Sequence, residues 1–167
     1  MKILHTSDWH LGKNLEGYSR LEEQGQFLEE LLEIVDREKI DLVIISGDIY
    51  DSGNPPAKAE KLFYSYLKRI TKGGKIPTLV IAGNHDNPER LVAASPLAYE
   101  QGIILLGTPK SKALIGDYDY YSIIDAGEGY LEIEKNKERL VALTIPYPSE
   151  KRLNEMLSES MDEEEQQ

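Results

Sequence analysis

Three apolar stretches of this sequence each run directly into a loop that opens with carboxylate, amide or imidazole side chains. These are residues 1–7 before Asp8-Trp9-His10, residues 41–46 before Gly47-Asp48, and residues 76–82 before Gly83-Asn84-His85-Asp86. Such runs are typical of buried strands, and ligands bind at the carboxyl ends of the strands in an open α/β sheet. A single Asp or Asn after a strand is most often a turn residue. Three such coincidences favour a polar cluster at one edge of a sheet.

The spacing of apolar residues predicts helices between these strands. Residues 20–38 and 59–70 place apolar side chains at steps of three and four, as in an amphipathic helix packed on a sheet. A third predicted helix, over residues 89–99, is interrupted by Pro96. Residues 103–106 are predicted to form a fourth strand.

The second half of the sequence is predicted to be rich in β-structure. Short β-type runs occur at residues 118–124, 130–133 and 140–145, with turn residues between them. The predicted order is β-α-β-α-β-α-β followed by β-hairpins, which is an α/β sandwich with a largely parallel first half. Residues 1–148 are expected to form one domain, and residues 149–167 a helix that fades into a disordered acidic tail.

The overall composition restricts the function classes. A net charge of −11 argues against a generic nucleic-acid binder, because neutralising phosphates requires clustered Lys and Arg. The sequence contains no Cys, so disulfides and thiolate metal sites are excluded. The first strand reaches Asp8 too early for a secretory leader, and no apolar run approaches the ~18 residues that span a membrane. A cytoplasmic location is therefore expected.

The residue types at the strand ends are those of a metal site. Asp8 and His10 are two residues apart at a strand end, so their side chains point to the same side. Asp48 follows a Gly that allows close backbone approach, and Asn84 offers a carbonyl oxygen. This set suits Mn²⁺, Mg²⁺, Fe²⁺ or Zn²⁺. Two ions ~3.5–4 Å apart would clamp an in-line displacement at phosphorus, with Asp48 central enough to bridge them and His85 free to act as a general acid.

Nearby polar and aromatic residues have simpler interpretations. His5 lies inside the first strand and is interpreted as a core histidine that is either packed or satisfied by a hydrogen bond. Asp51 is expected to support its loop by bonding backbone amides rather than a metal, and Asp86 is placed in the same supporting group. Trp9 is interpreted as an aromatic that packs against its loop.

These residues also carry a family resemblance. Asp8-Trp9-His10, Gly47-Asp48-Ile49-Tyr50-Asp51 and Gly83-Asn84-His85-Asp86 resemble the first three motifs of the calcineurin-like metallophosphoesterases. The longer strings at residues 5–13, 47–56 and 145–148 are similar to those of the SbcD-type nucleases within that superfamily. The resemblance extends to about Leu153 and implies a β-sandwich flanked by helices.

The resemblance also implies roles and partners. Asp8, His10, Asp48 and Asn84 would be metal ligands with Asp48 bridging, and His85 would protonate the leaving group. The family implies Mn²⁺, with Mg²⁺ as an alternative, and exonuclease and endonuclease action on DNA ends in repair and recombination. It also implies a homodimer and an SMC-like ATPase partner, SbcC. Basic residues near the motifs are candidates for DNA phosphate contacts: Lys13, Arg20 and Arg90.

The sequence departs from the family pattern in its histidines. The family completes its site with a lone His and a Gly-His-x-His motif, whereas His85 is the last of three histidines here. The expectation is an N-terminal fragment with an incomplete second half, with little or no nuclease activity by itself. Two alternatives stay open: a small-substrate metallophosphoesterase of the same fold, and a non-catalytic dimerisation or partner-binding module.

Dimerisation is expected to involve the second and third helices. Residues 62–67 carry more apolar and aromatic side chains than one contact with a sheet requires, which predicts an exposed apolar face.

Overall fold

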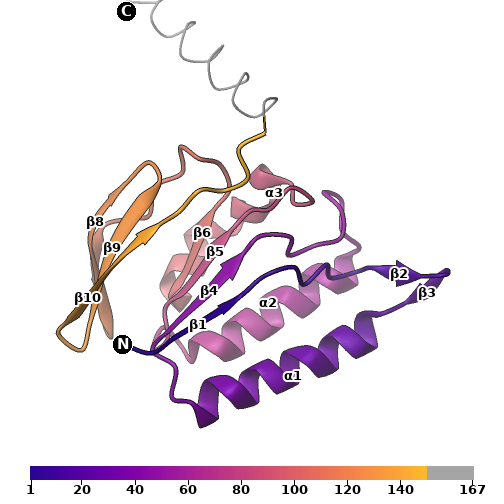
Figure 1. Cartoon of the computed structure of the whole chain (residues 1–167), viewed down its shortest axis with the longest axis horizontal. Coiled ribbons are helices and arrows are strands. Elements are labelled where there is room, and N and C mark those ends of the chain that lie inside the picture. The colour runs from indigo at the N-terminus through magenta and orange to yellow at the C-terminus, as the bar shows by residue number, and fades with distance from the viewer. Residues whose placement is uncertain (150–167) are drawn as a thin grey trace, which may run out of the picture.

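A four-stranded parallel sheet forms the centre of the molecule in the computed structural model, which describes residues 1–149. Its strands, in spatial order, are β1 (Ile3–Thr6), β4 (Leu42–Ser46), β5 (Thr78–Ile81) and β6 (Ile103–Leu106). Each strand lies beside the one before it, always in the same direction across the sheet. Since crossovers between parallel strands are right-handed, this order places every connecting helix on one face of the sheet, as Figure 1 shows.

Two long helices cover that face. They are α1 (Leu21–Arg37) and α2 (Ala57–Thr71), close to the predicted ranges. Their apolar stripes are buried against the sheet, with Leu28, Phe63 and Leu67 all 0% exposed. Burying a side chain of this size stabilises a fold by roughly 1.5–3 kcal/mol, so packing against the sheet holds these helices in place.

The third predicted helix is broken into three short pieces. They are α3 (Pro88–Val92), α4 (Ser95–Ala98) and the 3₁₀ turn η1 (Tyr99–Gln101). Asn87 caps α3 by accepting a hydrogen bond from Arg90 N. Pro96 lies at the start of α4, where its missing N–H costs nothing. Proline therefore begins a new helix here instead of kinking a continuous one.

A four-stranded antiparallel sheet covers the other face of the parallel sheet. Its strands, in spatial order, are β10 (Glu138–Leu143), β9 (Tyr130–Lys135), β8 (Tyr121–Gly127) and β7 (Gly116–Tyr118). The predicted single run at 118–124 is two strands, because the chain turns back between Tyr118 and Tyr121, which pair with each other. Inward side chains such as Ile123 and Ile133 pack on Leu79 and Ile104. The fold is an α/β sandwich with hairpins, as expected.

Two segments need separate description. The loop expected after the first strand contains a small hairpin, β2 (Asn14–Leu15) paired with β3 (Tyr18–Ser19). The predicted terminal helix and acidic tail lie outside the described residues. Within residues 1–149, no helix is long and apolar enough to cross a membrane.

The predicted exposed apolar face on α2 is wrong for the single chain. Phe63, Tyr66 and Leu67 are buried, at 0%, 8% and 0% exposure, and Leu62 and Tyr64 pack partly against the same core. The core uses these side chains because α2 packs both beside α1 and against the sheet. The apolar content of α2 therefore gives no argument for dimerisation.

Candidate metal centre

The three polar loops meet at the carboxyl end of the parallel sheet, where backbone hydrogen bonds tie the first loop to the second and carboxylates tie the second to the third. Asp8 N donates to Gly47 O at 3.1 Å, and His10 N donates to Asp48 O at 2.9 Å. Asp8, His10 and Asp48 all have left-handed backbones, with φ of 59°, 45° and 49°. Such conformations cost on the order of 1–3 kcal/mol each and cluster at functional sites. The loops give up stability to hold these three side chains in place.

Two glycines allow the second and third loops to touch. A Cβ added to Gly47 would lie 2.8 Å from Gly83 Cα. A Cβ added to Gly83 would lie 2.1 Å from Asp48 Oδ1 and 2.2 Å from Asp48 N. Real Cβ atoms do not approach other atoms so closely, so the position of the Asp48 carboxylate requires Gly at 83.

Asp8, His10 and Asp48 form a cluster that suits a cation. Their nearest ligand atoms all lie within 4.8 Å of one another. His10 Nε2 is 3.9 Å from Asp8 Oδ1 and 3.9 Å from Asp48 Oδ2. Ligand atoms that share one ion at ~2.1 Å lie roughly 3–4.2 Å apart. The distances from His10 fall in that range, so these residues fit a divalent metal.

Asp48 is the most enclosed of the three ligating groups. Its side chain is 13% exposed, against 65% for Asp8. Its Oδ1 accepts a hydrogen bond from His85 N at 3.0 Å, while Oδ2 faces His10. Asp48 therefore connects the first and third loops.

His85 is oriented by the backbone of the second loop. Its Nδ1 lies 2.9 Å from Asp51 O. A carbonyl oxygen can only accept, so Nδ1 carries the proton and Nε2 remains for another partner. The rings of His10 and His85 pack edge to face, with centroids 4.9 Å apart. A second group of potential ligands, His10, Asp51 and His85, lies beside the first.

Asp86, and not Asp51, supports the loops through backbone amides. The Asp86 carboxylate is buried and accepts from Ile49 N at 3.2 Å, Tyr50 N at 3.0 Å and Gly83 N at 2.8 Å. Asp51 Oδ1 instead lies 3.4 Å from His10 Nδ1 and 3.8 Å from Lys13 Nζ. The amide-bonding role expected of Asp51 is therefore wrong. The Asp51 carboxylate lies beside His10 and His85.

Asn84 lines the same hollow as Asp8 and Asp48, which measures about 280 Å³. The chain returns to this hollow after β10, where Tyr147 N donates to Ala82 O at 3.0 Å. Ile145, Tyr147 and Pro148 form one wall of it. The predicted ligands Asp8, His10, Asp48 and Asn84 thus come together at one end of the sheet.

Sequence reasoning missed Gln24, a residue of α1 that positions the first loop. Gln24 Nε2 donates to His10 O at 2.7 Å, and Gln24 Oε1 accepts from Gly12 N at 3.0 Å. A glutamine in an amphipathic helix looks like any other polar surface position, so no sequence signal identifies it. Trp9 is 5% exposed and packs edge to face on Phe27 and Phe63, which confirms its packing role.

The three candidate DNA contacts lie in different surroundings. Lys13 and Arg20 line a second hollow of about 340 Å³ beside Asp8 and His10, where Arg20 Nε donates to Glu23 Oε2 at 2.7 Å. Arg90 is held by Glu60 Oε1 at 2.8 Å and Asn54 Oδ1 at 2.9 Å. Glu60 and Asn54 therefore occupy the Arg90 guanidinium in this structure.

His5 is not a core histidine, contrary to the sequence interpretation. It is exposed, and its Nε2 lies 2.6 Å from Ser46 Oγ. β1 is the edge strand of the parallel sheet, and Ile3 on the same side of β1 is 39% exposed. The position of β1 at the edge explains why an apparently central residue faces solvent.

Comparisons with known proteins identify the family. The calcineurin-like phosphoesterase family matches residues 1–166. The chain is 49% identical over 163 residues to a protein of Bacillus subtilis named as the SbcD subunit of nuclease SbcCD, covering 98% of this chain and 38% of the relative. A protein of the same name from Rhodobacter capsulatus is 38% identical over 109 residues, 65% of this chain and 27% of the relative. This chain thus spans well under half the length of these relatives.

Proposed function

The chain belongs to the calcineurin-like phosphoesterase family, and from that premise we propose that it is the N-terminal part of a metal-dependent nuclease that cleaves DNA phosphodiester bonds. The observation that carries the proposal is the cluster of Asp8, His10 and Asp48, whose ligand atoms lie within 4.8 Å of one another at the strand ends. The names of the relatives support a nuclease subunit over a small-substrate phosphoesterase.

Asp8, His10, Asp48 and Asn84 would hold the metal. Carboxylate, amide and imidazole donors without thiolates suit Mn²⁺ or Mg²⁺. A divalent cation bound there would act as a Lewis acid on the phosphodiester and favour deprotonation of the attacking water. The protein contributes fixed ligand positions, because the loops are tied by backbone hydrogen bonds and Gln24 anchors the first of them.

His85 would act as the general acid. Its Nδ1 proton is engaged by Asp51 O, which fixes the ring and leaves Nε2 for the substrate. In its doubly protonated form, His85 would give the Nε2 proton to the leaving oxygen of the DNA strand. Asp51 and Asp86 would act as positioning residues, the first through its carbonyl and the second through three backbone amides.

The partners in this proposal are DNA ends, a second copy of the chain and an SMC-like ATPase subunit, in the cytoplasm. Relatives named as one subunit of nuclease SbcCD support a partner protein. Lys13 and Arg20 line the hollow beside the metal ligands and would contact DNA phosphates. Because the net charge is −11, contacts of this kind must be few and local.

The 167-residue chain by itself should cleave DNA poorly. Of the three histidines, His5 lies against Ser46, and His10 and His85 already have roles in this proposal, so no further imidazole is left to hold a second metal. Without two ions, the attacking and leaving oxygens of an in-line displacement are not clamped together. We therefore expect metal binding without strong nuclease activity in this chain.

Metal binding and cleavage can be tested separately. Mn²⁺ should raise the melting temperature of the chain, Asp48→Asn should remove that rise, and His85→Ala should retain it. Asp36→Asn is the matched control, because this exposed carboxylate near the end of α1 pairs with Lys72 far from the loops. An Mn²⁺ effect of equal size in Asp48→Asn would refute the metal assignment.

Digestion of linear DNA with Mn²⁺ tests the activity, with the full-length Bacillus subtilis relative as the positive control. We expect weak cleavage by this chain and strong cleavage by the longer relative. Strong Mn²⁺-dependent cleavage by this chain, abolished in Asp48→Ala, would show that His10 and His85 suffice.

A further inference from the structure

A third cavity lies at the opposite end of the parallel sheet from the candidate metal centre. It measures about 410 Å³, and its lining includes Gly74, Tyr99, Gly102, Tyr118, Asp119 and Tyr121. Gly73 and Gly74 follow α2 and lead toward the start of β5, and Gly102 immediately precedes β6. The metal ligands follow the carboxyl ends of these strands, so the sheet separates the two sites.

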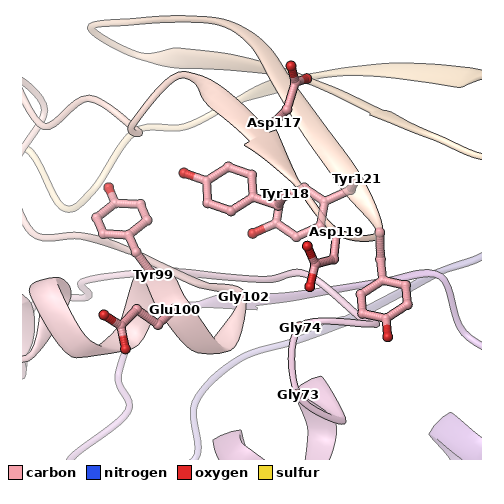
Figure 2. A pocket seen from close by; sticks show the side chains of 10 residues that line it. Gly73, Gly74, Tyr99, Glu100, Gly102, Asp117, Tyr118, Asp119 and Tyr121 are labelled. Atoms are coloured by element: carbon pink, nitrogen blue, oxygen red, sulfur yellow. The ribbon is translucent and has the colours of Figure 1, made fainter.

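Aromatic side chains form the walls of this cavity, and the main chain of glycine residues forms its base. The rings of Tyr118 and Tyr121 stack with centroids 4.7 Å apart and an interplanar angle of 11°. Figure 2 shows Tyr99 facing this pair across the cavity, above the glycine segments. A Cβ added to Gly102 would lie 2.8 Å from Gly74 Cα, so these backbones touch and no side chain rises from them.

The electrostatic surroundings of the cavity favour a positive charge. Asp119 points toward the cavity in Figure 2, whereas Asp117 points away and accepts a hydrogen bond from Ser122 Oγ at 2.7 Å. Glu100 lies on the lower wall. The carboxyl end of α2 adds partial negative charge near Gly73. Two cations lie near the cavity: Lys75 Nζ is 5.7 Å from the centre of the Tyr120 ring, and Lys135 Nζ donates to Lys75 O at 2.6 Å. The ring of Tyr120, a residue that lines the cavity, therefore already attracts the ammonium group of Lys75.

The burial of the Tyr121 hydroxyl indicates that the cavity binds a ligand. Tyr121 is 4% exposed, and its oxygen is buried without a hydrogen-bond partner among residues 1–149. Burial raises the pKa of this phenol, so the group is neutral. A buried polar atom without a partner destabilises a fold. Here the atom belongs to a residue that lines the cavity, where a bound group could satisfy it.

We propose that this cavity binds an organic cation, an alkylammonium or guanidinium group. Aromatic faces attract such cations through their quadrupole, the Asp119 carboxylate supplies the counter-charge, and the Tyr121 oxygen accepts an N–H. Small divalent metals prefer several oxygen ligands in close array, which stacked rings do not provide. Anions are repelled by Glu100 and Asp119. The source of the cation is either a free polyamine or a basic side chain of a partner protein.

The test is calorimetric titration of the full 167-residue chain with two probes, spermidine and Nα-acetyl-lysine amide. Tyr121→Phe keeps the stacked ring and removes only the hydroxyl, and Asp119→Asn removes the counter-charge. Each should weaken binding by about 10-fold, because hydrogen bonds to charged groups are the strong ones. Tyr130→Phe is the matched control for a lost phenol, since its hydroxyl bonds Asp125 outside the cavity. Asp125→Asn is the control for a lost carboxylate, because Asp125 does not line the cavity.

The probes distinguish the two sources. Tighter binding of spermidine assigns the site to a free polyamine, and tighter binding of Nα-acetyl-lysine amide assigns it to a partner's side chain. Absence of binding by both probes at millimolar concentration would overturn the proposal. So would affinities that fail to fall in either Tyr121→Phe or Asp119→Asn, because attraction would then come from the overall charge of −11. Tyrosine ring NMR spectra of each variant establish that the stack with Tyr118 is intact.

Discussion

The carboxylate of Asp48 occupies the space that a side chain at position 83 would need. A Cβ at residue 83 would lie 2.1 Å from Asp48 Oδ1, so the two loops can approach only because residue 83 is Gly. This contact joins the second loop, which carries Asp48, to the third, which carries Asn84 and His85. The geometry of the candidate metal centre therefore depends on a residue that ligates nothing.

Gly83→Ala should disrupt the metal centre. The new methyl group must displace Asp48 or the backbone of one loop, and overpacking of this kind costs about 1–3 kcal/mol. We expect a lower melting temperature and at least a 10-fold loss of Mn²⁺ affinity, measured by thermal shift against Mn²⁺ concentration. Native Mn²⁺ affinity in the variant would show that the close contact is not needed.

Gly25→Ala is predicted to stabilise the protein and provides a matched glycine substitution. Gly25 lies within α1, where a Cβ would meet only Leu62 Cδ1 at 3.9 Å, an ordinary contact. Replacing a helical Gly by Ala gains about 1 kcal/mol, or about 3 °C in melting temperature for a chain of this size. Calorimetry should show the higher melting temperature, and the affinity for Mn²⁺ should be unchanged. A fall would mean that α1 and α2 cannot accept the methyl group.

Asp86→Asn should destabilise the loops although Asp86 is not proposed as a ligand. The carboxylate accepts hydrogen bonds from three backbone amides, and an amide side chain would turn an N–H₂ toward one of them. The expected loss is about 3 kcal/mol, by urea unfolding. Asp51→Asn is the comparison, with an expected change below about 1 kcal/mol because that side chain is 36% exposed. Equal effects of the two substitutions would contradict the assigned roles.

The contact between α1 and α2 should weaken in acid through Glu29. Hydrogen bonds from Arg69 and Tyr66 lower the pKa of Glu29 from 4.5 to about 2. A depressed carboxyl pKa stabilises the fold above the unfolded-state value, and that stability is lost as pH falls from about 4.5 to about 2. Glu29→Gln should therefore lower the melting temperature at pH 7, with the difference from the native chain vanishing near pH 2.

Glu30→Gln is the control for this pH dependence, because Glu30 is exposed on the same helix. It should leave the melting temperature and its acid dependence unchanged. A constant difference between the native chain and Glu29→Gln from pH 7 to pH 2 would exclude the carboxylate as its source.

The sequence by itself determined the frame of the fold and the edge where the site lies. The strand predicted at 103–106 has the bounds that the structure shows, and the apolar stretch at 41–46 contains the strand Leu42–Ser46. The reason is physical: apolar runs too short for helices form buried strands, and parallel strands bring their carboxyl ends to one edge. Asp8, His10 and Asp48 could be placed together because each follows such a strand.

Only the tertiary structure decided which side chains serve which purpose. It assigned the amide-bonding role to Asp86, placed His5 on an exposed edge strand and turned Gln24 toward His10 O. It also assembled the aromatic cavity from segments between Gly73 and Tyr121. Periodicity reports only whether a residue faces the core or solvent, within one element. Contacts between distant segments depend on how sheets and helices pack, and neither the spacing of residues nor their chemical type encodes that packing locally.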